Sequence, residues 1–460
     1  MSPRPTQPPP PGPVRSPAFP PVQRRSLPVG LPLLAVPARR HPVVTVAAVL
    51  EAGALRDPPH RAGLADWTFE LLRSGTERRD ADGLAEALEG LGVHLTTETT
   101  WDATVVSFTA LREVLPQALA LWAELLRQPS FPDDEVERTR RERLAALRQR
   151  RTDPRALANE AFARTLFAST SPFARAVDGL PETIARIQRS DIVAFHAAHA
   201  RPAGAAIVAA GDVDADEFVD RVTPWLEGWV GAPPAPPAID LTTNPAPRVV
   251  VVHRPGSVQS ELRVGHLGTA RGDPAYAAVL VLNTLLGGAF GSRLNLNLRE
   301  RRGYTYGAHS AFALRRHPGP FVVATAVQTE VTGAALGEIL HELRAVVEGP
   351  ILPTEVDDAR TYLAGTFALP LETTAGLASR LVELHVHRLP DDSVPRFLEE
   401  LARVDVDAVQ AAVRRLLHPD RVVVTIVGDA ERVAPQLEGL GLPGPDVVDP
   451  DTFLAEPSHG

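Results

Sequence analysis

The chain has 460 residues, a formal net charge of -9, no cysteine and no lysine. The missing cysteines exclude disulfides and thiolate metal sites, and the missing lysines exclude a Walker-type phosphate loop and a Schiff-base lysine. The acidic balance argues against nucleic acid as the main partner, because phosphate binding requires a basic surface. The length predicts two domains of about 200 residues each rather than one core.

The sequence predicts no transmembrane helix, because no stretch approaches about 18 consecutive apolar residues. The N-terminus begins Met-Ser-Pro-Arg and has no apolar signal core. The compartment therefore stays open. A cytoplasmic location is the default expectation, and a periplasmic location applies if a native signal has been removed.

Proline dominates residues 1–26, which predicts a disordered tail. From residue 27 to residue 230, apolar strand-like runs alternate with amphipathic helical patterns, so a first α+β domain is expected. Its expected strands are residues 31–36, 43–50, 95–101, 103–110 and 205–210. Its expected helices are residues 63–76, 82–91, 115–127, 131–151, 155–167 and 190–198.

A second proline-rich stretch, residues 231–247, predicts a linker. The same order of patterns then returns in residues 248–445, and a tail over residues 446–460 closes the chain. Segments 201–212 and 418–429 share an Arg-Pro or His-Pro start and a Gly-Asp end, which indicates a duplication. The sequence thus predicts two α+β units in tandem, each a mostly antiparallel sheet covered by helices on one side.

Residues 63–76 read Gly-Leu-Ala-Asp-Trp-Thr-Phe-Glu-Leu-Leu-Arg-Ser-Gly-Thr and predict a helix that ends at a Ser-Gly break. Asp66 and Glu70 lie four residues apart, so their carboxylates share one face. They form either a carboxylate metal site or a solvated acidic pair. The acidic pair is the better interpretation, because zinc prefers some imidazole and no histidine lies three or four residues from either carboxylate.

The Gly-Leu-Ala and Gly-Thr ends of this segment resemble the frame of the zinc-binding helix of the insulinase-like (M16) metallopeptidases. Those enzymes carry His-x-x-Glu-His inside the frame, and these three residues fall on Asp66, Phe69 and Glu70. The resemblance implies that the zinc ligands and the general base are replaced, since a phenyl ring cannot accept a proton. The resemblance extends over nearly all of residues 28–440 and implies two tandem M16 domains.

The family's third zinc ligand is a glutamate in the helix that is expected here between residues 154 and 167. The alignment leaves open whether Ala156 or Glu160 takes that position. Even with Glu160, three carboxylates without an imidazole make a poor zinc site, although a weak site for a hard cation stays open.

Residues 298–307, Leu-Arg-Glu-Arg-Arg-Gly-Tyr-Thr-Tyr-Gly, carry a second family motif. The resemblance implies that Arg299 and Tyr306 bind the substrate peptide or its reacting carbonyl. Their chemistry suits this role, because a guanidinium donates a fixed fork of hydrogen bonds and a phenol can donate to an oxyanion. From the residues alone, the alternative is an ion-pairing helix residue and a strand that begins at Tyr306.

Two further patterns favour structural roles. His196 and His199 lie three residues apart and could share a metal, but the resemblance aligns them with an ordinary segment. Residues 287–292, Gly-Gly-Ala-Phe-Gly-Ser, could suggest phosphate binding, yet no lysine follows and no parallel βα unit is evident. The resemblance instead implies a loop that leads into the next helix.

Together these features predict a non-catalytic M16 subunit that forms a heterodimer with a homologue bearing His-x-x-Glu-His. The partner would hold the zinc, this chain would need no cofactor of its own, and Arg299 and Tyr306 would bind the peptide. One alternative is a structural or assembly protein of the same fold, similar to the core subunits of respiratory complex III. The other is a divergent hydrolase with a carboxylate-bound metal.

Overall fold

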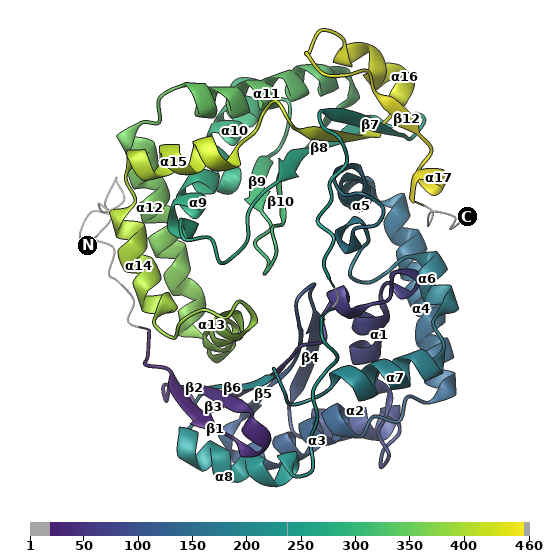
Figure 1. Ribbon diagram of the computed structural model, residues 1–460, viewed down its shortest axis with the longest axis vertical. Coiled ribbons are helices and arrows are strands. Elements are labelled where there is room, and N and C mark those ends of the chain that lie inside the picture. Colours follow the sequence, from purple (N-terminus) through teal and green to yellow (C-terminus); the bar gives the residue numbers. More distant parts are fainter. Residues whose placement is uncertain (1–18, 237, 455–460) are drawn as a thin grey trace, which may run out of the picture.

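The computed structural model describes residues 19–236 and 238–454, which form two α+β halves at opposite ends of the molecule (Figure 1). Each half contains a six-stranded sheet, with strand orders β1-β2-β6-β3-β5-β4 and β12-β7-β11-β8-β10-β9. Most neighbouring strands in both sheets are antiparallel. The predicted fold class is therefore confirmed.

The strands of the N-terminal half are β1 (Gln23–Ser26), β2 (Pro32–Pro37), β3 (Val43–Leu50), β4 (His94–Thr99), β5 (Thr104–Leu111) and β6 (Ala206–Gly211). Its helices are α1 (Leu64–Glu70), α2 (Ala81–Gly90), α3 (Leu115–Arg127), α4 (Asp133–Thr152), α5 (Pro154–Leu166), α6 (Pro181–Arg186), α7 (Arg189–His199) and α8 (Ala215–Leu226). A 3-10 turn, Leu71–Ser74, continues α1 up to the predicted Ser-Gly break.

The strands of the C-terminal half are β7 (Arg248–His253), β8 (Gln259–Leu267), β9 (Ala308–Phe312), β10 (Pro320–Gln328), β11 (Val423–Gly428) and β12 (Asp446–Val448). Its helices are α9 (Tyr276–Asn283), α10 (Arg293–Asn295), α11 (Thr332–Glu348), α12 (Pro353–Ala368), α13 (Thr374–Val386), α14 (Ser393–Arg403), α15 (Val406–Leu416), α16 (Ala430–Val433) and α17 (Pro450–Leu454). The order β2-β6-β3-β5-β4 returns as β7-β11-β8-β10-β9, as the internal repeat predicts.

Both predicted tails contain ordered strands. The tail expected over residues 1–26 is wrong at its end, because Gln23–Ser26 forms β1 and pairs antiparallel with β2. Residues 1–18 of that tail lie outside the described residues. In the tail expected over residues 446–460, β12 pairs parallel with β7 and is followed by α17. The edges of a sheet offer free backbone N–H and C=O groups, so segments with little apolar pattern can still pair there.

Helices cover both faces of each sheet, rather than one face as the sequence analysis expects. α13 of the C-terminal half packs on β3 and β6, and α5 of the N-terminal half packs on β8 and β11. The first contact buries Leu377 and Leu381 against the first sheet, and the second buries Leu157 and Ala161 against the second sheet. Because β6 and β11 are buried at every residue, both of their faces require apolar cover.

Polar contacts also join the halves through the hairpin between β9 and β10. The guanidinium of Arg316 donates to the two carboxylate oxygens of Glu51 at 2.9 and 2.6 Å, and its backbone N–H donates to Asp102 at 3.0 Å. Burial opposes the charge of Glu51, but Arg316 outweighs burial and lowers the pKa of that carboxyl. The hairpin of one half is thus held against the other half by charge-assisted hydrogen bonds.

Within the described residues, one helical stretch, Tyr276–Arg301, has the length and apolar composition of a membrane span. Its most apolar window is 61% buried inside the structure, and the core helix of a soluble protein passes the same criteria. The stretch is therefore weak evidence for a membrane contact.

The exchange of helices can be tested with Leu381→Ala in α13, a fully buried residue that packs on the sheet of the other half. We expect the free energy of unfolding to fall by about 3 kcal/mol, since truncating a buried leucine costs roughly 2–5 kcal/mol. Urea denaturation measures this change. Leu369→Ala makes the same substitution at an exposed leucine just before α13, and an equal loss in both variants would contradict the packing described.

Candidate functional site

Helix α1 lies against the first sheet, and its residues Trp67 and Phe69 are fully buried. Asp57 holds its N-terminus, because the carboxylate accepts the backbone N–H groups of Gly63 and Ala65 at 2.8 Å each. Gly63 has a φ of 92°, and a Cβ there would lie 2.7 Å from the carbonyl oxygen of Asp178. The glycine that opens the predicted frame is therefore required by backbone packing.

Asp66 and Glu70 both face the guanidinium of Arg143 from α4. Arg143 Nη2 donates to Asp66 Oδ2 at 2.5 Å, and its Nε donates to Glu70 Oε2 at 2.6 Å. The Arg143 side chain is only 12% exposed. Burial opposes its charge, but the two carboxylates more than offset burial and raise the pKa of Arg143. The sequence offered a metal site or a solvated pair, whereas the structure shows two acceptors for one buried cation.

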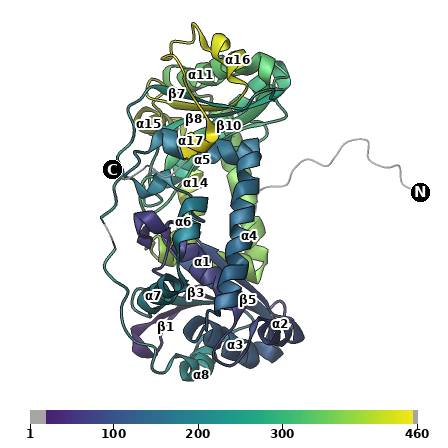
Figure 2. The same cartoon turned by 90° about the vertical axis from the view of Figure 1, so that its right-hand side faces the viewer.

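Figure 2 shows α4 running along the long axis of the molecule. Besides the Arg143 ion pairs, two further side-chain contacts hold α4 against α1. Trp67 Nε1 donates to Thr139 Oγ1 at 3.0 Å, and the guanidinium of Arg140 lies 4.9 Å from the centroid of the Trp67 ring. Thr139 and Arg140 lie on α4 about one helical turn before Arg143. The position of its guanidinium is therefore set by helix packing as well as by the carboxylates.

Phe69, which the resemblance aligns with the family's general base, belongs to the hydrophobic core. Its ring centroid lies 6.4 Å from that of His196, whose Nε2 is 2.9 Å from the carbonyl oxygen of Leu126. Burial lowers the pKa of His196 and of His199 to about 4, so both are neutral at pH 7. His196 and His199 thus act as core residues, and the described residues contain no group of three or more His, Cys, Asp or Glu arranged to hold a metal.

Glu160 points to arginine rather than to a metal site. Its Oε1 lies 3.6 Å from Arg151 Nη2, and its side chain is buried. Burial raises the pKa of Glu160 and thereby weakens its negative charge. Ala156 stands one turn earlier in α5 and offers no ligand atom. Neither candidate for the third ligand completes a metal set with Asp66 and Glu70 in the described part of the chain.

Arg299 and Tyr306 differ from the residues on α1, because both of their side chains are accessible to solvent. Arg299 lies in a π-helical turn, Leu296–Arg301, after α10, and its guanidinium stacks 4.4 Å from the centroid of the exposed Phe290 ring. Its Nε is 3.4 Å from Glu300 Oε1. Tyr306 is 95% exposed and lies in the loop before β9, so the strand expected to begin at Tyr306 begins at Ala308 instead.

Asn295, which the sequence analysis did not single out, ties the loops of this region together. Its Oδ1 accepts the backbone N–H of Ala308 at 3.0 Å. Its Nδ2 donates to the carbonyl of Ala289 and to Ser292 Oγ, each at 3.2 Å. The side chain is buried, so the segments that carry Phe290 and Tyr306 share one fixed support. The sequence signal that could have identified this residue is a polar asparagine between two leucines in an apolar helical segment.

Gly287 and Gly288, two of the three glycines of residues 287–292, serve packing. A Cβ on Gly287 would lie 2.5 Å from the backbone nitrogen of Ser310 in β9, and one on Gly288 would lie 2.8 Å from the amide nitrogen of Asn283. Glycine therefore allows the backbone of the loop to approach the sheet closely. The loop leads into α10, in agreement with the structural interpretation of this segment.

Sequence profiles of one family match both halves of the chain. The insulinase (peptidase family M16) profile matches residues 34–173, and the peptidase M16 inactive domain profile matches residues 186–363. The chain belongs to the M16 family. In this M16 protein, the first matched region contains Asp66, Phe69 and Glu70, and the second contains Arg299 and Tyr306.

Similar proteins carry different names. An uncharacterized zinc protease of Streptomyces coelicolor is 27% identical over 402 residues, 86% of this chain and 87% of that protein. The non-peptidase homolog YmxG of Helicobacter pylori is 27% identical over 335 residues, 72% and 75% of the two chains. Cytochrome b-c1 complex subunit 1 of Bos taurus is 24% identical over 54% of this chain and 51% of that protein.

The fold of this M16 chain is also found in solved structures. A crystal structure of a peptidase M16 inactive domain from Pseudomonas fluorescens superposes with a TM-score of 0.83 and 29% sequence identity, covering 89% of this chain and 98% of that one. Since relatives with this fold include one named as a protease and one named as a non-peptidase, the side chains at each site have to decide between activities.

Arg143→Gln tests the ion pairs on α1, because it leaves Asp66 and Glu70 close together without their cation. We expect unfolding to become easier by about 2 kcal/mol at neutral pH, which is less than the roughly 3–5 kcal/mol for a fully buried pair. The discount reflects Glu70, whose side chain is 40% exposed. Thermal denaturation measures the difference.

Arg148→Gln is the control, since Arg148 is an exposed residue of α4 without a hydrogen bond or ion pair in the described chain. Asp66→Asn and Glu70→Gln, added to Arg143→Gln, should restore most of the lost stability by removing the unpaired charges. An Arg143 variant as stable as the Arg148 variant would contradict the role assigned to the ion pairs.

The two histidines of α7, His196 and His199, predict a loss of stability in acid. Their folded pKa of about 4 lies below the ordinary 6.5, so the unfolded chain binds more protons between these values. Their contribution is complete above pH 6.5 and is lost as the pH falls towards 4. We expect each histidine to lower the free energy of unfolding by roughly 1–2 kcal/mol at pH 5, relative to neutral pH. Unfolding measured at pH 7.5 and pH 5 should show a smaller difference for His196→Gln, and an unchanged difference would count against this explanation.

Proposed function

We propose that this chain is a non-catalytic M16 subunit that binds peptide substrate and completes the active site of a homologue bearing His-x-x-Glu-His. The observation that carries the proposal is a contrast between two regions. On α1, the carboxylates of Asp66 and Glu70 both accept hydrogen bonds from the guanidinium of Arg143. In the C-terminal half, Arg299 and the fully accessible Tyr306 lie beside a backbone that Asn295 holds in place.

Hydrolysis by this chain alone lacks a chemical basis on α1. Phe69 has no basic atom and is buried, so it cannot take a proton from an attacking water. A divalent cation at Asp66 and Glu70 would have to displace Arg143 or lie beside its positive charge. These observations support a partner subunit as the holder of the zinc, and they disfavour the alternative of a carboxylate-metal hydrolase.

The Arg299 region suits a peptide. The Nη atoms of Arg299 and the hydroxyl of Tyr306 make no hydrogen bond in the described part of the chain, so both can donate to peptide carbonyls. The exposed ring of Phe290 lies under the Arg299 guanidinium and adds an apolar surface for a substrate side chain. Donors for carbonyls and an apolar face are the groups that an extended peptide requires.

A structural role in a larger assembly is the second candidate. It is supported by the likeness to cytochrome b-c1 complex subunit 1 and to the non-peptidase homolog YmxG. Such a role makes no use of an accessible Arg299 and Tyr306. The two candidates therefore differ in what a substitution at these positions does.

The test uses an M16 homologue from the same genome that carries His-x-x-Glu-His and a fluorogenic peptide library. We expect this chain to raise the peptidase activity of that homologue, and Arg299→Ala to remove at least nine-tenths of the gain. Tyr306→Phe should lower the gain by a smaller factor, because it removes one hydroxyl donor. Arg301→Ala, an exposed arginine in the same turn, is the matched control and should keep the gain.

No gain on mixing would overturn the proposal. A gain that survives Arg299→Ala together with Tyr306→Phe would overturn the substrate role of these residues. If that double variant also forms the complex normally in size-exclusion chromatography, the structural alternative is favoured.

A further inference from the structure

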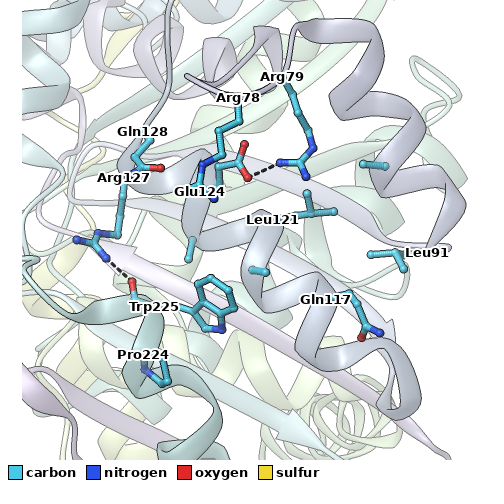
Figure 3. A pocket seen from close by; sticks show the side chains of 13 residues that line it. Arg78, Arg79, Leu91, Gln117, Leu121, Glu124, Arg127, Gln128, Pro224 and Trp225 are labelled. Atoms are coloured by element: carbon cyan, nitrogen blue, oxygen red, sulfur yellow. Dashed lines mark hydrogen bonds and ion pairs between the residues drawn. The ribbon is translucent and has the colours of Figure 1, made fainter.

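A pocket lies among α2, α3 and the end of α8, and Figure 1 places these helices at the end of the molecule away from the C-terminal half. Figure 3 shows the side chains that line it, and neither site described above uses them. It has a volume of about 470 Å³ and is bounded by α2, α3, residues 78–79 and the end of α8. This volume falls within the roughly 300–1,000 Å³ of typical ligand sites. Its apolar lining consists of Ala87, Leu91, Ala120, Leu121, Ala123 and Pro224.

The charge of the pocket is positive, although the whole chain is acidic. Arg78, Arg79 and Arg127 line it together with one carboxylate, Glu124. Glu124 pairs with Arg79 and also accepts a hydrogen bond from the Thr76 hydroxyl at 2.5 Å. Arg78 contributes to the positive charge that lowers the pKa of Glu124 but forms no ion pair with it in the described residues, and Arg127 has no ion pair there either, so the pocket keeps a net positive charge.

These two arginines differ in how they are held. Arg127 donates to the backbone carbonyl oxygens of Trp225 and Glu227, the latter at 2.8 Å, so its guanidinium is fixed but its charge is unpaired. The guanidinium of Arg78 makes no hydrogen bond or ion pair within the described residues. A carboxylate entering the pocket would find one preorganised and one free guanidinium.

The remaining polar groups suit a peptide main chain. The carboxamides of Gln117 and Gln128 make no hydrogen bond in the described chain, and each can pair with a backbone amide group. Trp225 is 37% exposed, while Trp67, Trp122 and Trp229 are buried. Figure 3 shows Arg78 and Gln128 on one side of the pocket and the Trp225 indole, with Pro224 near it, on the other.

We propose that this pocket binds an acidic peptide segment of a partner protein, in which a carboxylate stands next to an apolar or aromatic side chain. The carboxylate pairs with Arg78 and Arg127, and the apolar side chain lies on the leucine and alanine lining beside Trp225. Gln117 and Gln128 bond to the peptide backbone. Charge complementarity excludes a basic segment, and the two free carboxamides favour a peptide over a small carboxylic acid.

The experiment titrates the full chain with the peptide acetyl-Glu-Leu-Asp-Phe-Glu-amide and follows both binding heat and tryptophan fluorescence. We expect saturable binding that weakens at least tenfold in Arg78→Gln and in a matched peptide with Gln and Asn in place of Glu and Asp. Arg414→Gln removes one exposed arginine of α15 in the other half, without a hydrogen bond or ion pair in the described residues, and should bind normally. Trp225→Phe should lose the fluorescence change, because the indole that lines the pocket is its source.

Four results would overturn the proposal. They are the absence of saturable binding, equal affinity of the Arg78→Gln and Arg414→Gln variants, equal affinity of the acidic and the neutral peptide, and 3-phenylpropionate binding as tightly as the peptide. Arg78 is exposed at the surface, so Arg78→Gln is expected to fold, and circular dichroism of the variant verifies this before the titration.

Discussion

The arrangement of the molecule depends on an exchange of helices, in which each half contributes one helix to the sheet of the other half. The first sheet needs α13 to cover β3 and β6, and the second sheet needs α5 to cover β8 and β11. Each half alone would expose a continuous apolar face. The exchange also affects α1, because α5 follows α4 after a single residue, Asp153. Fixing α5 on the second sheet therefore also fixes the helix that brings Arg143 to α1.

The ion pairs on α1 place one side-chain cation between two carboxylates. Arg143 supplies one delocalised positive charge and directed N–H donors, so it neutralises part of the charge of Asp66 and Glu70 and satisfies their oxygens. Unlike a catalytic metal, a guanidinium offers no open coordination position for water. Phe69 lies in the core and has no atom that can accept a proton, so neither this ring nor the guanidinium of Arg143 supplies a general base on α1.

The two candidate binding regions rest on different supports. In the C-terminal half, one buried amide, Asn295, connects the loops that carry Phe290 and Tyr306, so the region is ordered by hydrogen bonds and keeps its side chains accessible. In the N-terminal half, the outer pocket is built from helix surfaces and contains more arginine than carboxylate. The first region suits a neutral peptide backbone, whereas the second favours a negatively charged segment. The chain thus carries an accessible Arg299 and Tyr306 in one half and an arginine-lined pocket in the other.

The sequence by itself determined the α+β class, the duplication and the identities at the family positions. Periodic apolar patterns report local structure, and Asp66, Phe69, Glu70, Arg299 and Tyr306 are read directly from the chain. The continuous apolar strands also held a signal that both sheet faces are buried, although they did not reveal which helices cover them. Only the tertiary structure decided the exchange of α5 and α13, the pairing of β1 with β2 and of β12 with β7, the support by Asn295 and the outer pocket. Arg143 lies 77 positions from Asp66, and a local pattern contains no information about which distant residue the folded chain brings against it.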